Sequence, residues 1–428
     1  MKRWLIGLLC ALTLTSLWGC KRTQKEPQPS ETAPATGPAV QNSEPTSPMQ
    51  TQEATTPSSE TEPTVPAPVE EEPSLVALTL DTYRENDEAK DGAILFSFLY
   101  QDAVVSMPDN ADAAEKINQF LADLHDAAAT YAQEPRSWAQ ENYTKGNDWT
   151  AHYYETTFQP ARLDEKIISL FGTSVEFTGG MHPETTLISY NFNSKTGKQL
   201  SLGDILTTDD MAQALYLKVL DKLEEFASSQ SKSADLIFSE GYLDTVQEHF
   251  NLSHDSSESW YFTNEGICFY FSPYEIAPYA VGPIQVELSF EDLSGILQED
   301  FYPLAPNFVD SFSINAAKEN LVQTDSFDHV HSIPVDTEGE SVALFTGSLV
   351  YNVRLVGGSW VDENNFQEEI TYFAANWLDA RDLLLIRTII PDTMPNLRVS
   401  MQIGDAEYRT YFIGQSGEDG SILLLENQ

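Results

Sequence analysis

The sequence predicts an α+β fold, in which an antiparallel sheet with packed helices is followed by a small β-rich domain. Three observations lead to this prediction. Residues 75–300 alternate between strand-like runs and amphipathic helical stripes. Residues 301–428 hold short strand-like runs separated by Gly, Asp, Asn and Pro clusters, and long helical patterns are scarce there. Residues 20–74 contain too few apolar side chains to form a core.

The N-terminus has the layout of a secretory signal peptide. A basic start precedes an apolar run from Trp4 to Trp18, which is short for a membrane span of ~20 residues. The stretch Leu17-Trp18-Gly19-Cys20 resembles a bacterial lipobox, and this implies cleavage before Cys20 with acyl chains such as palmitate on its thiol. The alternative is an ordinary signal peptide cut nearby. We expect residues 1–19 to be a lipoprotein signal peptide, and Cys20 to anchor the chain in the lipid bilayer of the cell membrane, on the extracellular side.

Residues 20–74 are predicted to be a disordered tether. They consist mainly of Pro, Thr, Ser, Glu and Gln, with few sizeable apolar groups. Such a composition buries too little apolar surface to offset the entropy lost on ordering. The tether would hold the folded body at a distance from the membrane.

The charge of the chain limits its partners. The formal net charge is −43, a field that repels phosphate backbones and anionic lipid headgroups. We therefore expect no nucleic-acid partner. The acidic residues either keep an exported protein soluble or attract a basic ligand, and the composition leaves both open.

Strand and helix signals follow one another between residues 75 and 250. Strands are expected at 75–80, 92–106, 149–158, 166–177 and 188–192. One helical stripe runs from Ile117 to Tyr131, with Asp109, Asn110 and Asp112 as candidate caps. Two more helices are expected at 211–226 and 242–250. Gly179-Gly180-Met181-His182-Pro183 is the densest set of turn signals, and we interpret 179–198 as a hairpin.

Several blocks in this region together resemble a known family. They are Gly179 to Pro183, Thr196-Gly197-Lys198, Thr263 to Ile267, Ser272 to Ala280, and Val286 to Leu293. In order and spacing they are similar to the extracytoplasmic module of PdaC/RsiV-like proteins, which include a peptidoglycan deacetylase and a lysozyme-sensing anti-sigma factor. Met181 stands where a small residue is common in the motif.

This resemblance implies an α+β domain over residues 75–300 and an outward-facing binding role. The expected ligand is cell-wall glycan (peptidoglycan) or a cationic wall-active protein such as lysozyme. No deacetylase-type metal signature follows Leu297, so we expect no catalytic residues, no cofactor and no metal, and a chain that is not an enzyme. A peptidoglycan-modifying enzyme, or a structural or adhesion lipoprotein, is the alternative.

Candidate ligand-binding residues come from two segments of this module. Gly179, Gly180, His182 and Pro183 form the first, where His182 either contacts a ligand or only completes a turn. Tyr274 and Tyr279 lie in a Pro-punctuated loop, where they either face sugar rings or pack beneath the sheet.

Other chemistry-bearing residues give weaker signals. His329 and His331 share one side of a strand beside Asp328, but no third or fourth metal ligand is near them in sequence. His249 and His254 form a similar unsupported pair. Cys10 would leave with the signal peptide and Cys20 would carry the lipid, so Cys268 has no disulfide partner. Its strand-like neighbours predict a buried, inert thiol rather than a nucleophile.

Residues 301–428 are predicted to be a β-rich C-terminal domain. Gly404-Asp405 is expected to be a two-residue hairpin turn, and the surroundings of Trp360 and Trp377 are candidates for a ligand face, a core or turns. The strand candidates are 341–355, 370–373, 382–390, 397–403, 407–413 and 421–425.

Overall fold

A computed structural model describes residues 74–427, except 146–148, 232, 253–258, 310, 363–364 and 392–393. The predicted signal peptide, Cys20, nearly all of the tether and His254 lie outside the described residues. The fold class is α+β, as the sequence predicted, with antiparallel pairing dominant and a β-rich C-terminal region.

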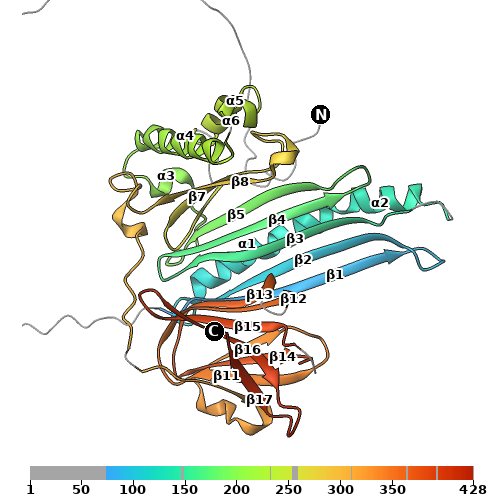
Figure 1. Cartoon of the computed structure of the whole chain (residues 1–428), viewed down its shortest axis with the longest axis vertical. Helices are drawn as coiled ribbons and strands as arrows, with labels where there is room; N and C mark the ends of the chain where they lie inside the picture. Colours follow the sequence, from blue (N-terminus) through green and yellow to red (C-terminus); the bar gives the residue numbers. More distant parts are fainter. Residues whose placement is uncertain are drawn as a thin grey trace, which may run out of the picture. The chain divides into compact units, whose positions relative to one another are not determined.

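The central feature is a long mixed sheet (Figure 1). Among the described residues, ten strands form it in the order β17-β16-β15-β12-β13-β1-β2-β3-β4-β5. All of its neighbouring strands are antiparallel except β2 and β3, which are parallel because two helices cross over between them. Its first elements are β1 (Ala77–Glu88), β2 (Ile94–Ser106), α1 (Ala111–Tyr131), α2 (Gln133–Asn142), β3 (His152–Leu163), β4 (Ile167–Phe177) and β5 (Glu184–Asn193).

The α1 helix confirms the predicted apolar stripe. Ile117 and Leu121 are fully buried against the sheet, and α1 lies along β2. Asn110 is the N-cap residue, but its side chain donates to the Ser194 and Lys195 carbonyls instead of capping α1. The sequence did not predict α2, because this helix is mostly polar and buries only Pro135 and Ala139.

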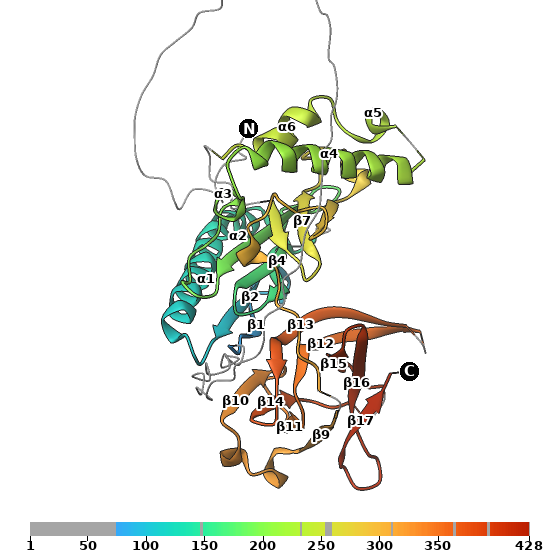
Figure 2. The same cartoon turned by 90° about the vertical axis from the view of Figure 1, so that its left-hand side faces the viewer.

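A second layer covers the face of β4 and β5 that lies opposite α1 and α2 (Figure 2). It consists of a three-stranded antiparallel sheet with helices outside it, and Leu215, Val219 and Leu223 on one face of α4 fill the core between them. The predicted helices at 211–226 and 242–250 are confirmed. The elements of this layer are α3 (Leu202–Ile205), α4 (Met211–Ser229), α5 (Ala234–Ile237), α6 (Tyr242–Glu248), β6 (Trp260–Phe262), β7 (Gly266–Phe271) and β8 (Ile284–Ser289).

Buried polar side chains attach this layer to the long sheet. Asn191 of β5 donates to the Trp260 carbonyl and accepts from the Phe262 amide, and Ser169 of β4 also accepts from the Phe262 amide. Both side chains are fully buried. Because buried polar groups are costly without partners, these bonds fix the position of β6 on the sheet.

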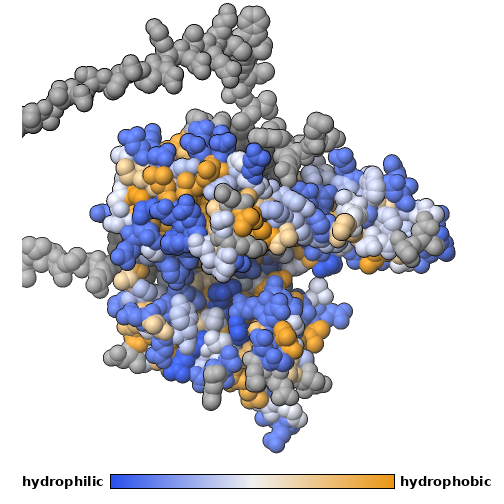
Figure 3. Space-filling view, turned by 45° about the horizontal axis from the view of Figure 1, so that its top comes forward, coloured by the Kyte–Doolittle hydropathy of each residue, from blue (hydrophilic) through white to orange (hydrophobic). Residues whose placement is uncertain are grey.

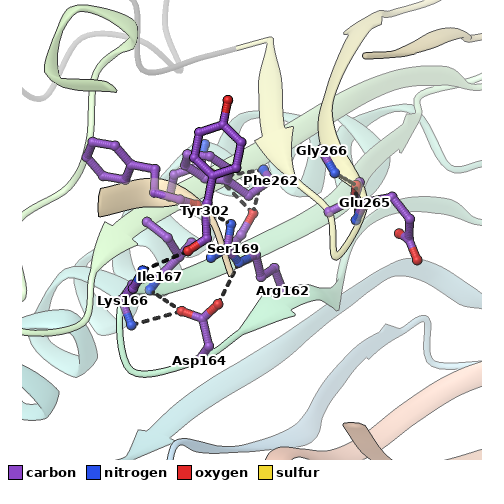
Figure 4. A network of polar contacts seen from close by, with 12 residues as sticks. Arg162, Asp164, Lys166, Ile167, Ser169, Phe262, Glu265, Gly266 and Tyr302 are labelled. Carbon is purple, nitrogen blue, oxygen red and sulfur yellow. Dashed lines mark hydrogen bonds and ion pairs between the residues drawn. The ribbon is translucent and has the colours of Figure 1, made fainter. Parts of the chain in front are cut away.

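A buried arginine at the end of β3 makes a further polar connection to the segment after β8 (Figure 4). Arg162 is 2% exposed, and its Nε donates to the Asp164 carboxylate at 2.7 Å while a terminal nitrogen donates to the Phe301 carbonyl at 2.8 Å. Lys166 donates from Nζ to the Tyr302 carbonyl nearby. The segment after β8 is therefore held against the end of the sheet by charged groups of the β3–β4 turn.

The C-terminal region contains a four-stranded sheet in the order β10-β14-β11-β9, together with five strands of the long sheet. One expected strand, 341–355, is in fact two strands, because the chain turns between them and Thr346 Oγ1 donates to the Ser348 carbonyl. The hairpin turn is Asp405–Ala406, one residue later than predicted, because Gly404 still pairs with Glu407. The strands are β9 (Ile314–Lys318), β10 (His329–Pro334), β11 (Glu340–Thr346), β12 (Val350–Asp362), β13 (Asn365–Leu378), β14 (Asp382–Thr388), β15 (Leu397–Gly404), β16 (Glu407–Gln415) and β17 (Ile422–Glu426).

The long sheet crosses the predicted domain boundary at residue 300. Ala77 of β1 pairs with Ala375 of β13, and the Asn376 side chain accepts from the Val76 amide at 2.9 Å. Strands from both ends of the chain thus share one hydrogen-bonded sheet. The division into domains at 75–300 and 301–428 stays a prediction.

Candidate functional site

The candidate site begins at the turn that joins β4 to β5. Gly179 and Gly180 have φ angles of +94° and +111°, a region that side chains other than glycine rarely adopt. No atom lies within 4 Å of the position that a Cβ would take on Gly180. The backbone conformation, rather than space, therefore requires glycine there. Met181 next to it is fully exposed.

His182, at the end of this turn, contacts both candidate tyrosines. Its ring stacks on Tyr279 with a centroid distance of 3.8 Å and an interplanar angle of 15°. Its Nε2 lies 3.1 Å from the Tyr274 hydroxyl, and its Nδ1 lies 2.9 Å from the Pro183 carbonyl oxygen. Because a carbonyl only accepts, Nδ1 carries a proton, and in the neutral ring Nε2 accepts from Tyr274. We call His182, Tyr274 and Tyr279 the ring cluster.

The loop that carries the two tyrosines is braced from two sides. The Glu275 carboxylate accepts from the Ser272 amide at 2.7 Å and lies 2.7 Å from His249 Nε2 at the end of α6. Ser272 Oγ accepts from the Leu187 amide of β5. Tyr274 has a φ of +71°, a strained conformation for a residue with a side chain. These contacts hold Tyr274 in place although 48% of it is exposed.

The structure thus brings together candidates that are far apart in sequence. His182, Pro183, Tyr274 and Tyr279 meet at one surface, with Gly179 and Gly180 shaping the turn. Tyr274 is exposed, so it does not pack beneath the sheet. Exposed aromatic faces with hydroxyl and imidazole edges can stack on a sugar ring and bond its hydroxyls.

Tyr153 belongs beside this site, and sequence reasoning did not select it. Burial, and then the charge of Glu155 and the proximity of Tyr279, raise the pKa of Tyr153. The residue lies on β3, where the alternation of side chains places it on the face opposite His152 and Tyr154. The alternation along β3 could have pointed to Tyr153, but only the structure places this face of the strand next to Tyr279.

The other candidate residues have structural partners. His331 lies 3.3 Å from the Asp382 carboxylate, and both side chains are largely buried. His249 is paired with Glu275, as described above. Within the described ranges no group of three or more His, Cys, Asp or Glu side chains is arranged to hold a metal ion. No helix in the described part of the chain is long and apolar enough to cross a membrane.

Cys268 lies in β7 and is 4% exposed, which confirms the predicted buried position. Burial raises the pKa of its thiol to about 11. A thiolate is the reactive form of cysteine, so this residue is a poor nucleophile near neutral pH.

The outer helices expose a few apolar side chains. Leu217 of α4, Leu236 of α5 and Leu243 of α6 are 52%, 75% and 44% exposed. Figure 3 shows hydrophobic residues gathered among hydrophilic ones in the part of the molecule that carries these helices. The rest of that face is mainly hydrophilic, in keeping with the net charge of −43.

The comparisons with known proteins point to one family. Residues 204–291 match the family model described as "Protein of unknown function (DUF3298)". This segment contains a DUF3298 domain. The domain runs from the end of α3 to just beyond β8, so it includes Tyr274 and Tyr279, whereas the turn with His182 lies before it. The ring cluster therefore joins the DUF3298 domain to the preceding part of the chain.

Two solved structures of the DUF3298 family are similar to this chain. One, from Bacteroides fragilis, is 16% identical, and the match covers 53% of this chain and 94% of that protein with a TM-score of 0.41. The other, from Pseudomonas aeruginosa, is 17% identical, and the match covers 53% of this chain and 98% of that protein with a TM-score of 0.35. No protein with a curated description matches the chain.

Proposed function

We propose that this chain is a lipid-anchored protein of the bacterial cell surface that binds the glycan of the cell wall through the ring cluster. The observation that carries the proposal is the meeting of His182, Tyr274 and Tyr279. Residues more than ninety positions apart in sequence form one stack, with 3.8 Å between the His182 and Tyr279 ring centroids, in which His182 and Tyr274 are exposed and Tyr279 is half-buried.

The chemistry of the cluster suits a neutral sugar. Aromatic faces favour the apolar C–H face of a pyranose ring, and a tyrosine hydroxyl both donates and accepts hydrogen bonds. The cluster is also held rigid by Glu275 and by the Pro183 carbonyl. A rigid, pre-formed surface loses little conformational entropy when it binds a ligand. The PdaC/RsiV-like resemblance, in proteins that act at the cell wall, supports the same ligand.

The anchor in this proposal is Cys20. Two or more acyl chains on Cys20 would be enough for durable membrane attachment, which a single chain does not give. Cys20→Ala should leave the protein soluble or as an uncleaved precursor. A processed form that remains in the membrane would show that another feature anchors the chain.

Sedimentation with purified cell-wall sacculi tests the glycan proposal. The wild-type protein should pellet with sacculi, and it should still do so at raised salt because neutral sugar contacts are not screened. Tyr279→Ala should remain largely in the supernatant. Tyr408→Ala is the matched control, because Tyr408 is 55% exposed on β16, outside the cluster. Equal pelleting of all three proteins would contradict the proposal.

A cationic wall-active protein such as lysozyme is the second candidate ligand, and the net charge of −43 favours it. Attraction of this kind raises association rates mainly at low salt. Interferometry with lysozyme should then give an association rate that falls steeply as salt rises, while dissociation changes less. Equal binding by an unrelated acidic protein would remove this candidate.

A further inference from the structure

We infer that the glycan site extends past the Gly179–Gly180 turn onto a second group of rings formed by Trp138, Trp149 and His152. This inference rests on the proposed function and adds a subsite to it. We call these three residues the tryptophan sandwich. Together with the ring cluster, the sandwich would bind a neutral oligosaccharide of N-acetylated sugars rather than a single sugar.

His152 is held between two indole rings. Its ring stacks on Trp138 at 4.8 Å with an interplanar angle of 16°, and on Trp149 at 4.7 Å with an angle of 23°. His152 is 3% exposed, whereas Trp138 is 46% exposed. The Trp149 indole donates to the Ile94 carbonyl at 3.0 Å, which fixes its plane. The stack therefore presents Trp138 to solvent on a rigid base.

The sandwich adjoins the turn of the ring cluster directly. A Cβ on Gly179 would lie 3.7 Å from His152 Nε2. Phe177, two residues before that glycine, meets the His152 ring edge-on at 6.1 Å and stacks on Tyr153 at 5.6 Å. The three residue-to-residue steps from Gly179 to His182 span at most about 11 Å when extended. By the alternation along β3, the sandwich lies on the opposite face of the sheet from Tyr153 and Tyr279, so an oligosaccharide that contacts both ring groups passes around the Gly179–Gly180 turn.

The sandwich is suited to an uncharged ligand. Burial lowers the pKa of His152, so its imidazole is neutral at neutral pH. Its Nδ1 is buried without a hydrogen-bond partner among the described residues. The chain as a whole repels anions at a net charge of −43. A cationic peptide on the Trp138 face is the competing ligand, since cations also bind indole faces.

The test compares a disaccharide and a hexasaccharide of N-acetylglucosamine, with the full-length protein and tryptophan fluorescence as the readout. The hexasaccharide should bind wild type about tenfold more tightly than the disaccharide, the gain expected from one added ring contact. Trp138→Ala should lose this gain and keep its disaccharide affinity, and Trp138→Phe should keep part of the gain. Tyr279→Ala should weaken both sugars, and Tyr408→Ala neither.

Two results with the sugars would overturn the extended site. One is a wild-type affinity that does not grow with sugar length, and the other is a length gain that survives in Trp138→Ala. If Tyr279→Ala loses binding in either case, the proposed function stands and only the extension fails. Trp138-dependent binding of oligolysine in place of the sugars would also overturn it. Trp138 is half-exposed, so we expect Trp138→Ala to fold. An unchanged unfolding temperature of this variant checks that it does.

Discussion

At the scale of single residues, the site depends on backbone conformations that few residues can adopt. Gly179 and Gly180 have positive φ angles, and the Gly-Gly-x-His-Pro pattern allowed this turn to be predicted. The pattern did not show that His182 would stack on Tyr279, because that contact depends on how β5 and the 272–279 loop pack. The turn is therefore determined by the local sequence, whereas the ring cluster depends on tertiary packing.

Gly180→Val should weaken sacculus binding by moving His182 away from Tyr279. A valine at a φ of +111° costs about 1–3 kcal/mol, which the turn can relieve only by changing its backbone. Gly92→Val is the matched control, because Gly92 has a φ of +84° and equally open surroundings in the β1–β2 turn. Both variants should lose similar stability in urea unfolding, and only Gly180→Val should lose binding. Equal binding by the two variants would show that the conformation of the Gly179–Gly180 turn is not needed for binding.

Arg162→Ala should be among the most destabilising single substitutions. It removes the arginine donor from Asp164 Oδ2 and from the Phe301 carbonyl, and it removes a guanidinium that lies 5.4 Å from the Phe262 ring centroid. Breaking a buried ion pair of this kind costs about 3–5 kcal/mol. Arg409→Ala removes exposed ion pairs with Glu407 and Glu426, and it should cost much less stability than Arg162→Ala in the same unfolding experiment, because exposed ion pairs contribute little. Similar losses of unfolding free energy in the two variants would show that Arg162 does not hold the segment after β8 against the sheet.

At the scale of elements, the periodic segments were predictable and the polar ones were not. The α1 and α4 helices have clear apolar stripes, and the sequence located both. The α2 helix has none, and so its Trp138 could not be placed beside His152 before the structure was known. Of the site, the sequence supplied the turn and the tyrosine loop, but it missed the rings contributed by α2 and by the start of β3.

The packing of α2 on β3 should make stability depend on pH. Burial lowers the pKa of His152 below its usual 6.5, so the unfolded chain binds this proton more readily than the folded protein does. The unfolding free energy should therefore fall as pH decreases through 6.5, until the folded pKa is reached. Other groups titrate as well, so the test is the difference between proteins.

Urea unfolding between about pH 8 and about pH 5 measures this difference. His152→Phe should lose less stability over this range than wild type, because phenylalanine keeps the stack with both indoles and binds no proton. Parallel curves of unfolding free energy against pH for wild type and His152→Phe would show that His152 does not cause the pH dependence.

At the scale of the whole molecule, one sheet joins regions that the sequence suggested were separate. Short strand candidates after residue 307 predicted a β-rich region correctly, but they carry no information about which strands pair. The pairing of β1 with β13 is set by contacts such as that of Val76 with Asn376, about 300 positions apart. Such long-range pairing is specified by side-chain packing over the whole sheet rather than by local pattern.

Calorimetric titration of a soluble N-acetylglucosamine oligosaccharide decides whether the ring cluster binds cell-wall sugar. We expect one saturable binding event for wild type, an affinity at least about tenfold lower for the His182→Ala/Tyr279→Ala double variant, and an unchanged affinity for Tyr408→Ala. An absence of binding heat with wild type, or equal affinities for wild type and the double variant, would contradict it.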